Sequence, residues 1–142
     1  MAITVDIADA VVAELNEASF SKEFTAVRSY RPQYDLAEMS TLHVTVVPKA
    51  VVIAAVTRSG VQYDVSVDVA VQQHLDSEDA SAIDPLMDLV EEIADFFRLN
   101  PLSECPNVSW VKTENHPVYS PQHLEEFRQF TSVLMLTFLV VR

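Results

Sequence analysis

Glycine is almost absent from this sequence: Gly60 is the only one among 142 residues, where average usage near 7% would give about ten. Phosphate-cradling loops and dinucleotide-binding fingerprints need several glycines, because the backbone must approach the phosphates closely. The nucleophile elbow of α/β-hydrolases needs flanking glycines as well. The sequence therefore excludes these three kinds of site.

Cysteine and long apolar runs are also scarce. Cys105 is the single cysteine, so the chain can form neither an internal disulfide nor a zinc knuckle, as is typical of a reducing compartment. The longest apolar run, at 133–141, is about half of what a bilayer-crossing helix requires. No basic segment followed by an apolar stretch opens the chain. We expect a soluble intracellular product with no membrane partner.

Basic residues are few: there are nine, against 21 acidic residues, which gives a formal net charge of −12. No base lies between Arg58 and Arg98, a stretch that carries ten acids. Sequence-independent affinity for nucleic acid depends on clustered Lys and Arg that release counterions from phosphates. The sequence therefore predicts no measurable affinity for duplex DNA at about 0.1 M salt.

Two stretches have apolar residues at helical spacing. In the first, at 6–16, Asp6 and Asp9 occupy the predicted first turn, where carboxylates cap free amides. The second, at 83–97, follows a predicted loop at 76–82 and has Asp84 as its expected cap and Pro85 in its first turn.

Alternating apolar and polar residues predict strands at 24–30, 42–47 and 61–71, and further stretches at 51–57, 108–112 and 131–141 are also predicted to be strands. Pro48 is expected to end the strand at 42–47, and Ser59-Gly60 predicts a hairpin between the strands at 51–57 and 61–71. The strand at 61–71 has odd-numbered valines on one face and polar residues on the other, whereas the last strand is apolar on both faces. The last strand is therefore either covered on both sides or in contact with another subunit. Together these elements predict one α+β domain over residues 1–142, with a mainly antiparallel sheet of about four to six strands and two helices packed on one face.

The second helix carries carboxylates one turn apart, which could hold a divalent metal or supply an acid and base pair. These are Asp84, Asp88, Glu91, Glu92 and Asp95. They lie opposite the apolar stripe, where an amphipathic helix normally keeps its charges. We therefore expect no enzyme activity and no catalytic, metal-binding or cofactor-binding residue, and keep a small metal-dependent hydrolase as an alternative. The four histidines have no metal-ligand spacing, and Cys105, beside Glu104, is expected to be an unreactive thiol.

The segments that carry a resemblance to a known family are those at 7–15, 24–32, 42–48, 57–59, 63–69 and 83–93. In this order, and over nearly the whole chain, they resemble the tail terminator proteins (minor tail protein U type) and related tail completion proteins of long-tailed bacteriophages. The resemblance implies a virion protein, assembled in the host cytoplasm, whose subunits close into a ring, typically of six, at the head-proximal end of the tail tube. It also implies three partners, which are other copies of the chain, the tail tube protein and a head completion or connector protein.

Such a ring stops tube polymerisation and forms the surface that joins the head, while DNA passes through its channel without specific binding. Another head-tail connector of similar size and a generic cytosolic binding module remain alternatives. Rings above a dimer use heterologous contacts, and acidic subunits must be joined despite their repulsion. The few bases are therefore expected at subunit contacts, and the candidates are Arg28, Arg31, Lys49 and Arg58.

Overall fold

The computed structural model describes residues 2–30, 42–75, 80–115, 118–122 and 129–141. In chain order the elements are α1 (Ile3–Glu17), β1 (Ala26–Arg28), β2 (His43–Ala55), β3 (Val61–His74), α2 (Ala80–Leu99), β4 (Ser109–Asn115) and β5 (Gln129–Val141). The five strands form one sheet in the order β1-β2-β3-β5-β4. Only β1 and β2 pair in parallel, and the other neighbours are antiparallel. The predicted α+β class is confirmed.

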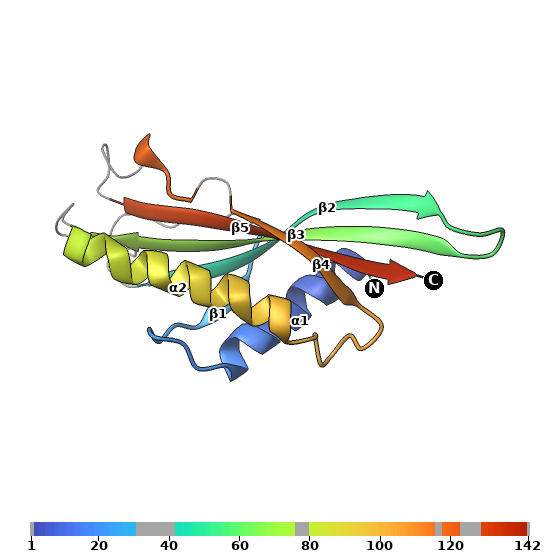
Figure 1. The fold of residues 1–142 in the computed structure, drawn as a ribbon, viewed down its shortest axis with the longest axis horizontal. Helices are drawn as coiled ribbons and strands as arrows, with labels where there is room; N and C mark the ends of the chain where they lie inside the picture. The colour runs from blue at the N-terminus through green and yellow to red at the C-terminus, as the bar shows by residue number, and fades with distance from the viewer. Residues whose placement is uncertain (1, 31–41, 76–79, 116–117, 123–128, 142) are drawn as a thin grey trace.

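Both α1 and α2 lie on the same face of the sheet (Figure 1). On β3 the side chains that face the helices are the predicted odd-numbered valines, and Val65, Val67, Val69 and Val71 are fully buried. The antiparallel register places Leu136 of β5 opposite Val67, so the helix-facing residues of β5 continue the same apolar layer. The core lies between this layer and the buried stripes of the two helices.

Helix α1 begins earlier than predicted. The carbonyl of Ala2 accepts hydrogen bonds from the N–H groups of Val5 and Asp6, at 3.1 and 3.0 Å, and the cap residue makes no side-chain bond. Asp6 lies in the first turn, as predicted, but the prediction of a side-chain cap and of a first-turn place for Asp9 is wrong, because the helix already begins at Ile3, which packs against the core. Asp9 lies well inside the helix and pairs with a base on β1.

The predicted break at Pro48 is also wrong. Strand β2 runs without interruption through Pro48, which pairs with Val67 of β3, and an irregularity in register between Pro48 and Ala50 accommodates the change. Among the described residues β1 pairs only with Val44 to Val46, so Pro48 lies on an edge of the described sheet, where proline is tolerated. The two predicted strands at 42–47 and 51–57 are one element.

Helix α2 starts at Ala80, so the predicted loop extends at least three residues too far and Asp84 is not a cap. Pro85 lies inside the helix rather than in its first turn. The apolar spacing at 83–97 predicted a stripe of Ile83, Leu86, Met87, Val90, Ile93, Ala94 and Phe97. Leu89, which that stripe lacked, is fully buried as well. The helix thus presents a broader apolar face than the sequence spacing indicated.

Strand β5 lies between β3 and β4, so it is covered by strands on both edges and by helices on one face. On its other face Thr131 and Thr137 are buried, Val133, Met135 and Leu139 are half-buried, and only Val141, at 56%, is exposed. In the connection before β5, Pro121 and Gln122 are helical. Within the part of the chain that the structure describes, no helix is long and apolar enough to cross a membrane.

Strand β1 is short, three residues rather than the predicted seven, and a side chain of α1 holds it in place. Asn16 Nδ2 donates to the carbonyl of Ala26 at 3.1 Å, and Asn16 Oδ1 accepts from the N–H of Ala26 at 2.8 Å. This pair of bonds fixes the start of the parallel β1–β2 ladder.

Replacing Asn16 with Ala is expected to lower the free energy of unfolding by about 1–3 kcal/mol, because both backbone groups of the buried Ala26 lose their partner. Urea melts measure this difference. Asn16→Asp keeps the acceptor and loses the donor, so its stability should fall between those of the wild type and Asn16→Ala. Equal stability of all three proteins would show that the clamp does not hold β1.

Candidate subunit-docking surfaces

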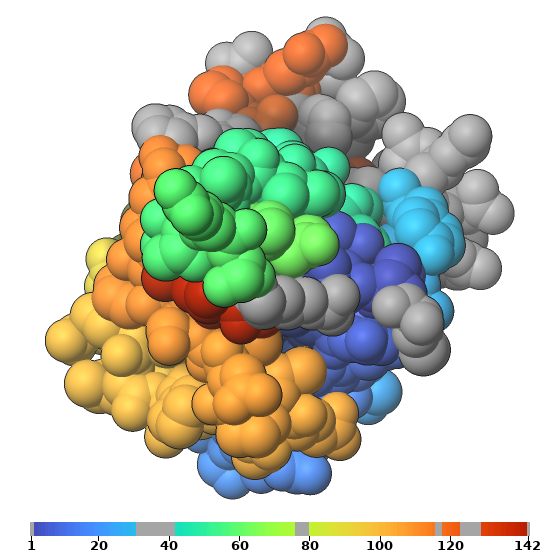
Figure 2. All heavy atoms as spheres, turned by 90° about the vertical axis from the view of Figure 1, so that its right-hand side faces the viewer, coloured from blue at the N-terminus to red at the C-terminus, as the bar shows by residue number. Residues whose placement is uncertain are grey.

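The hairpin formed by β2 and β3 projects beyond the rest of the molecule (Figure 1). We call residues 49–62 the arm. Every residue of β2 within it is exposed, and yet this part of β2 consists almost entirely of apolar residues. Val52 is 62% exposed and Ile53 is 58% exposed. Figure 2 looks at the molecule from the side toward which the hairpin projects, and the green atoms of the hairpin lie nearest the viewer.

The arm has two properties that favour contact with another chain. Its apolar residues occupy both faces, because Val52 lies opposite Asp64 and Ile53 lies opposite Tyr63 in the ladder with β3. Its outer edge has no neighbouring strand among the described residues, since β1 ends its pairing at Val46. A long, exposed, apolar edge strand is a template for pairing with another chain unless it is covered.

The tip of the arm is a tight turn, as Ser59-Gly60 predicted. The carbonyl of Gly60 accepts the N–H of Val56 at 3.1 Å, and the N–H of Gly60 donates to Thr57 Oγ1 at 2.8 Å. A Cβ at Gly60 would lie 2.8 Å from that hydroxyl oxygen, so any side chain there must displace it. Arg58, in this turn, makes no ion pair with the residues that the structure describes.

Of the four bases predicted at subunit contacts, two have partners within their own chain. Arg28 Nε lies 2.6 Å from Asp9 Oδ1, and its guanidinium also donates to the Tyr30 hydroxyl at 3.1 Å. These hydrogen bonds, the one to Tyr30 first, raise the pKa of Arg28 above its ordinary value. Lys49 pairs with Asp68.

Of the other two bases, the structure describes Arg58 and not Arg31. Arg31 lies outside the described residues. Arg58 is placed at the arm tip and is therefore the predicted contact that is best situated to reach another subunit. That these four bases lie at subunit contacts stays a prediction.

Asp68, on the sheet face opposite α1 and α2, is less exposed than the alternation on β3 predicted. Its side chain is 21% exposed, its Oδ2 lies 3.5 Å from Lys49 Nζ, and its Oδ1 is buried with no hydrogen-bond partner in the described structure. Burial raises the pKa of Asp68 above its ordinary value, and the attraction of Lys49 lowers it only in part. The ionised carboxylate therefore destabilises the isolated subunit.

This shift predicts a pH dependence. The folded state holds the Asp68 proton more tightly than the unfolded state, so this residue's contribution to stability falls as pH rises from the ordinary Asp pKa through the raised one. Asp68→Asn should therefore have a higher free energy of unfolding than the wild type at pH 7, and the difference should shrink at acid pH. Urea melts at pH 7 and about pH 4 measure it, and a difference independent of pH would contradict the shift.

A shallow groove of about 460 Å³ lies between α2 and the edge strand β4. Its apolar lining includes Val90 and Ala94 from α2 and Trp110 and Val111 from β4. The indole Nε1 of Trp110 donates to Thr113 at 2.8 Å, which holds the ring in the wall of the groove. Val111 is 45% exposed, so the groove is open to a partner.

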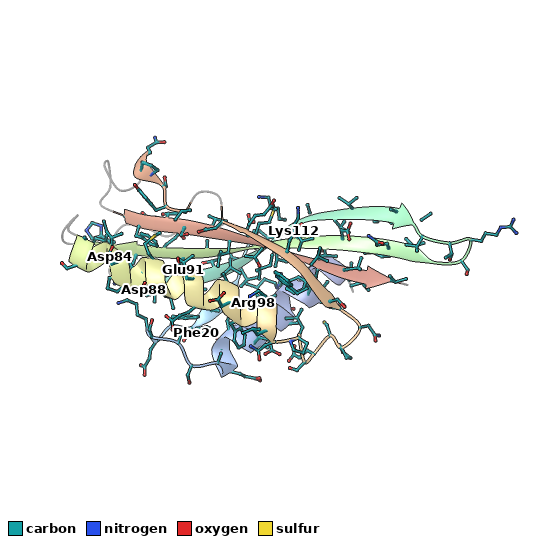
Figure 3. All side chains as sticks on the ribbon, in the orientation of Figure 1. Phe20, Asp84, Asp88, Glu91, Arg98 and Lys112 are labelled. Carbon is teal, nitrogen blue, oxygen red and sulfur yellow. The ribbon has the colours of Figure 1, made fainter. Side chains whose placement is uncertain are left out.

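Acidic side chains follow one another along α2 beside this groove. Asp84, Asp88 and Glu91 are labelled along the helix in Figure 3, and all three are exposed. None of them forms an ion pair within the described structure, whereas Asp95 lies 3.8 Å from Arg98. The groove lining itself holds Glu91 and Asp95 beside Arg98 and Lys112. Asp95 pairs with Arg98 and Lys112 pairs with Glu114, so Glu91 is the charged side chain of the lining without an ion pair in the described structure.

The hydrolase alternative depended on Glu92 and its neighbours. Glu92 accepts hydrogen bonds from the backbone N–H of Ser21, at 3.1 Å, and from the Ser21 hydroxyl. It thus ties the loop after α1 to α2, next to the ring contact of Phe20 with Phe96, whose centroids are 5.5 Å apart. No group of three or more His, Cys, Asp or Glu side chains among the described residues is arranged to hold a metal ion.

Cys105 is partly buried near the start of α1. Burial raises the pKa of its thiol above the ordinary value, and the nearby charges of Asp6 and Glu104 raise it further. The thiol is therefore a poor nucleophile at neutral pH, as the sequence predicted, although burial and not the neighbouring acid is the larger cause.

No protein-family model matches this chain, and no curated protein is significantly similar to it. The function is therefore inferred from the surfaces of the molecule itself.

Sequence reasoning located the hairpin and missed the arm. The signal was present: the run Val51 to Val56 is apolar without alternation, which fits either a buried strand or a strand that another chain covers. The groove between α2 and β4 had no sequence signal, because it depends on how a helix and a distant strand lie against the same sheet.

Proposed function

We propose that this chain is a structural protein of a phage tail, whose copies join into a ring of six at the head-proximal end of the tail tube. The ring ends tube polymerisation and provides the surface for a head completion or connector protein. DNA passes through it without specific binding. The protein acts in the virion, after assembly in the host cytoplasm, and performs no catalysis.

The observation that carries this proposal is the arm. A monomeric protein gains nothing from holding a row of valine and isoleucine side chains in water on a projecting edge strand, since each fully buried side chain of this kind is worth about 1.5–3 kcal/mol. A subunit of an assembly recovers that free energy when the neighbouring copy covers the arm. The arm therefore supports an assembly role more strongly than a catalytic one.

The charge of the chain fits the same role. A net charge of −12 makes adhesion to the DNA that slides past unfavourable. It also keeps a subunit with an exposed apolar arm soluble before assembly, because like charges oppose unspecific aggregation.

The proposal is tested in the phage that encodes the chain, by an early stop codon in its gene. Loss of a terminator should give tail tubes of excessive and variable length that do not join heads, as seen by electron microscopy. Tails of normal length that fail to join heads would indicate the alternative, a connector on the head side. Infectious particles of normal yield would contradict both.

The same strain gives a matched test of the arm. Supplied from a plasmid, the wild-type chain and Val118→Asp should restore normal tails, because Val118 is 44% exposed and lies outside the arm. The double variant Val52→Asp, Ile53→Asp should not.

A further inference from the structure

We infer that the arm of one copy docks in the groove between α2 and β4 of a second copy, with Arg58 of the first beside Glu91 of the second. This inference rests on the proposed ring and specifies its contact. The occupant of the groove is thus another molecule of this chain, and the contact joins two different surfaces.

The first argument is the chemical match between the two surfaces. The arm presents small and branched aliphatic side chains, such as Val52 and Ile53, on both faces of a narrow hairpin. The groove is open, is lined mostly by apolar surface and has a volume of about 460 Å³. This volume has room for several such side chains. Both surfaces are exposed in the isolated chain, so burial of one against the other removes apolar area from water on both sides.

The second argument is charge complementarity within a strongly acidic chain. Between His43 and Tyr63 the only charged residues are the bases Lys49 and Arg58. Lys49 pairs with Asp68 of its own chain, so the positive charge that the arm offers to another copy is that of Arg58. Helix α2 has five acidic residues and one basic residue, and Asp88 and Glu91 have no ion-pair partner in the described structure. In the groove itself, Arg98 and Lys112 are engaged by Asp95 and Glu114, so Glu91 is the acid that can attract Arg58 of the arm.

The third argument is geometric. Arm and groove lie apart on one molecule, because the arm projects past the end of the sheet while α2 runs beneath the opposite part of it (Figure 1). The arm is also held by its ladder with β3, so it cannot fold back into its own groove. Each copy therefore offers one arm and accepts another. Such a heterologous contact closes into a ring when its rotation permits and otherwise gives an open filament.

Mixing two variants that are defective on opposite surfaces tests this arrangement. The arm variant is Val52→Asp, Ile53→Asp, and the groove variant is Ala94→Gln, Val111→Gln, which fills the groove with polar side chains and leaves the charge unchanged. Under conditions in which the wild type associates, each variant alone should have the 15.9 kDa mass of one subunit by light scattering. Their mixture should form one-to-one pairs and nothing larger, because the groove variant retains an arm and the arm variant retains a groove.

A charge exchange at about 0.15 M salt tests the pairing of residues. Arg58→Glu and Glu91→Arg should each weaken association several-fold, and the protein with both changes should recover most of the loss. Thermal melts confirm that all variants are folded, which is expected because the altered side chains are exposed, apart from the half-buried Ala94.

The outcomes separate this inference from the proposed function. The groove is not the site that receives the arm if the groove variant associates as well as the wild type does. The same holds if the two defective variants do not pair when mixed. Neither result contradicts the proposed ring. If the double charge exchange does not restore association, the assigned pair is wrong. A wild type that never associates overturns both the ring and the contact.

Discussion

The variant Val52→Asp, Ile53→Asp is expected to lose self-association completely while its free energy of unfolding stays within about 1 kcal/mol of the wild type. Both side chains are more than half exposed in the subunit, so changes there affect stability only through strand propensity. In the assembly, by contrast, each Asp would bring a carboxylate into an apolar contact without a partner, which costs several kcal/mol per subunit contact. Light scattering and urea melts on the same samples measure the two effects.

The matched control for this variant is Val118→Asp, which adds the same charge at an exposed valine outside the arm. It should associate as the wild type does, apart from the small effect of the added negative charge. If the control and the arm variant lose association equally, net charge rather than the arm decides assembly. An arm variant that unfolds would show that the arm is part of the subunit core.

Val67→Asp is expected to unfold the subunit. Val67 is fully buried at the centre of β3, between Pro48 of β2 and Leu136 of β5, and it faces the helices. A carboxylate there has no cation to pair with, so we expect a loss of about 4 kcal/mol or more, a large part of the 5–15 kcal/mol that stabilises a typical domain.

The next residue along β3 provides the contrast. Asp68→Val removes a half-buried carboxylate that has one unpartnered oxygen and releases Lys49, which is itself half exposed, to water. We expect this variant to be at least as stable as the wild type at pH 7. Equal loss of stability in the two variants, measured in urea melts, would show that the helix-facing side of β3 is assigned wrongly.

The order of the helices and strands was predictable because each has a clear apolar period. The alternation at 61–71 and the stripe at 83–97 gave the correct elements, although their ends moved by several residues. The errors arose where the surrounding structure overrides a local rule. Pro48 is tolerated because it lies on an edge of the described sheet, and Pro85 because the rest of α2 is held by buried side chains such as Leu89.

The candidate interface was predictable only in part. Charge scarcity singled out the few bases, but the sequence could not show that Arg28 and Lys49 are engaged by Asp9 and Asp68 of the same chain. Those pairs depend on the parallel placement of β1 and on the register of β2 with β3, which involve residues far apart in sequence. Arg58, in a turn that the sequence did predict, is exposed at the arm tip without an ion pair to the described residues, and its place at a subunit contact stays a prediction.

The mass of the wild-type chain as a function of salt tests the ring most directly. Screening weakens the repulsion between acidic subunits, whereas the apolar contact of the arm persists. Light scattering behind a sizing column should therefore show association increasing from about 0.01 to 0.5 M salt, toward a discrete particle of six copies of the 15.9 kDa chain. A mass of one subunit at every salt and at high protein concentration would contradict the account.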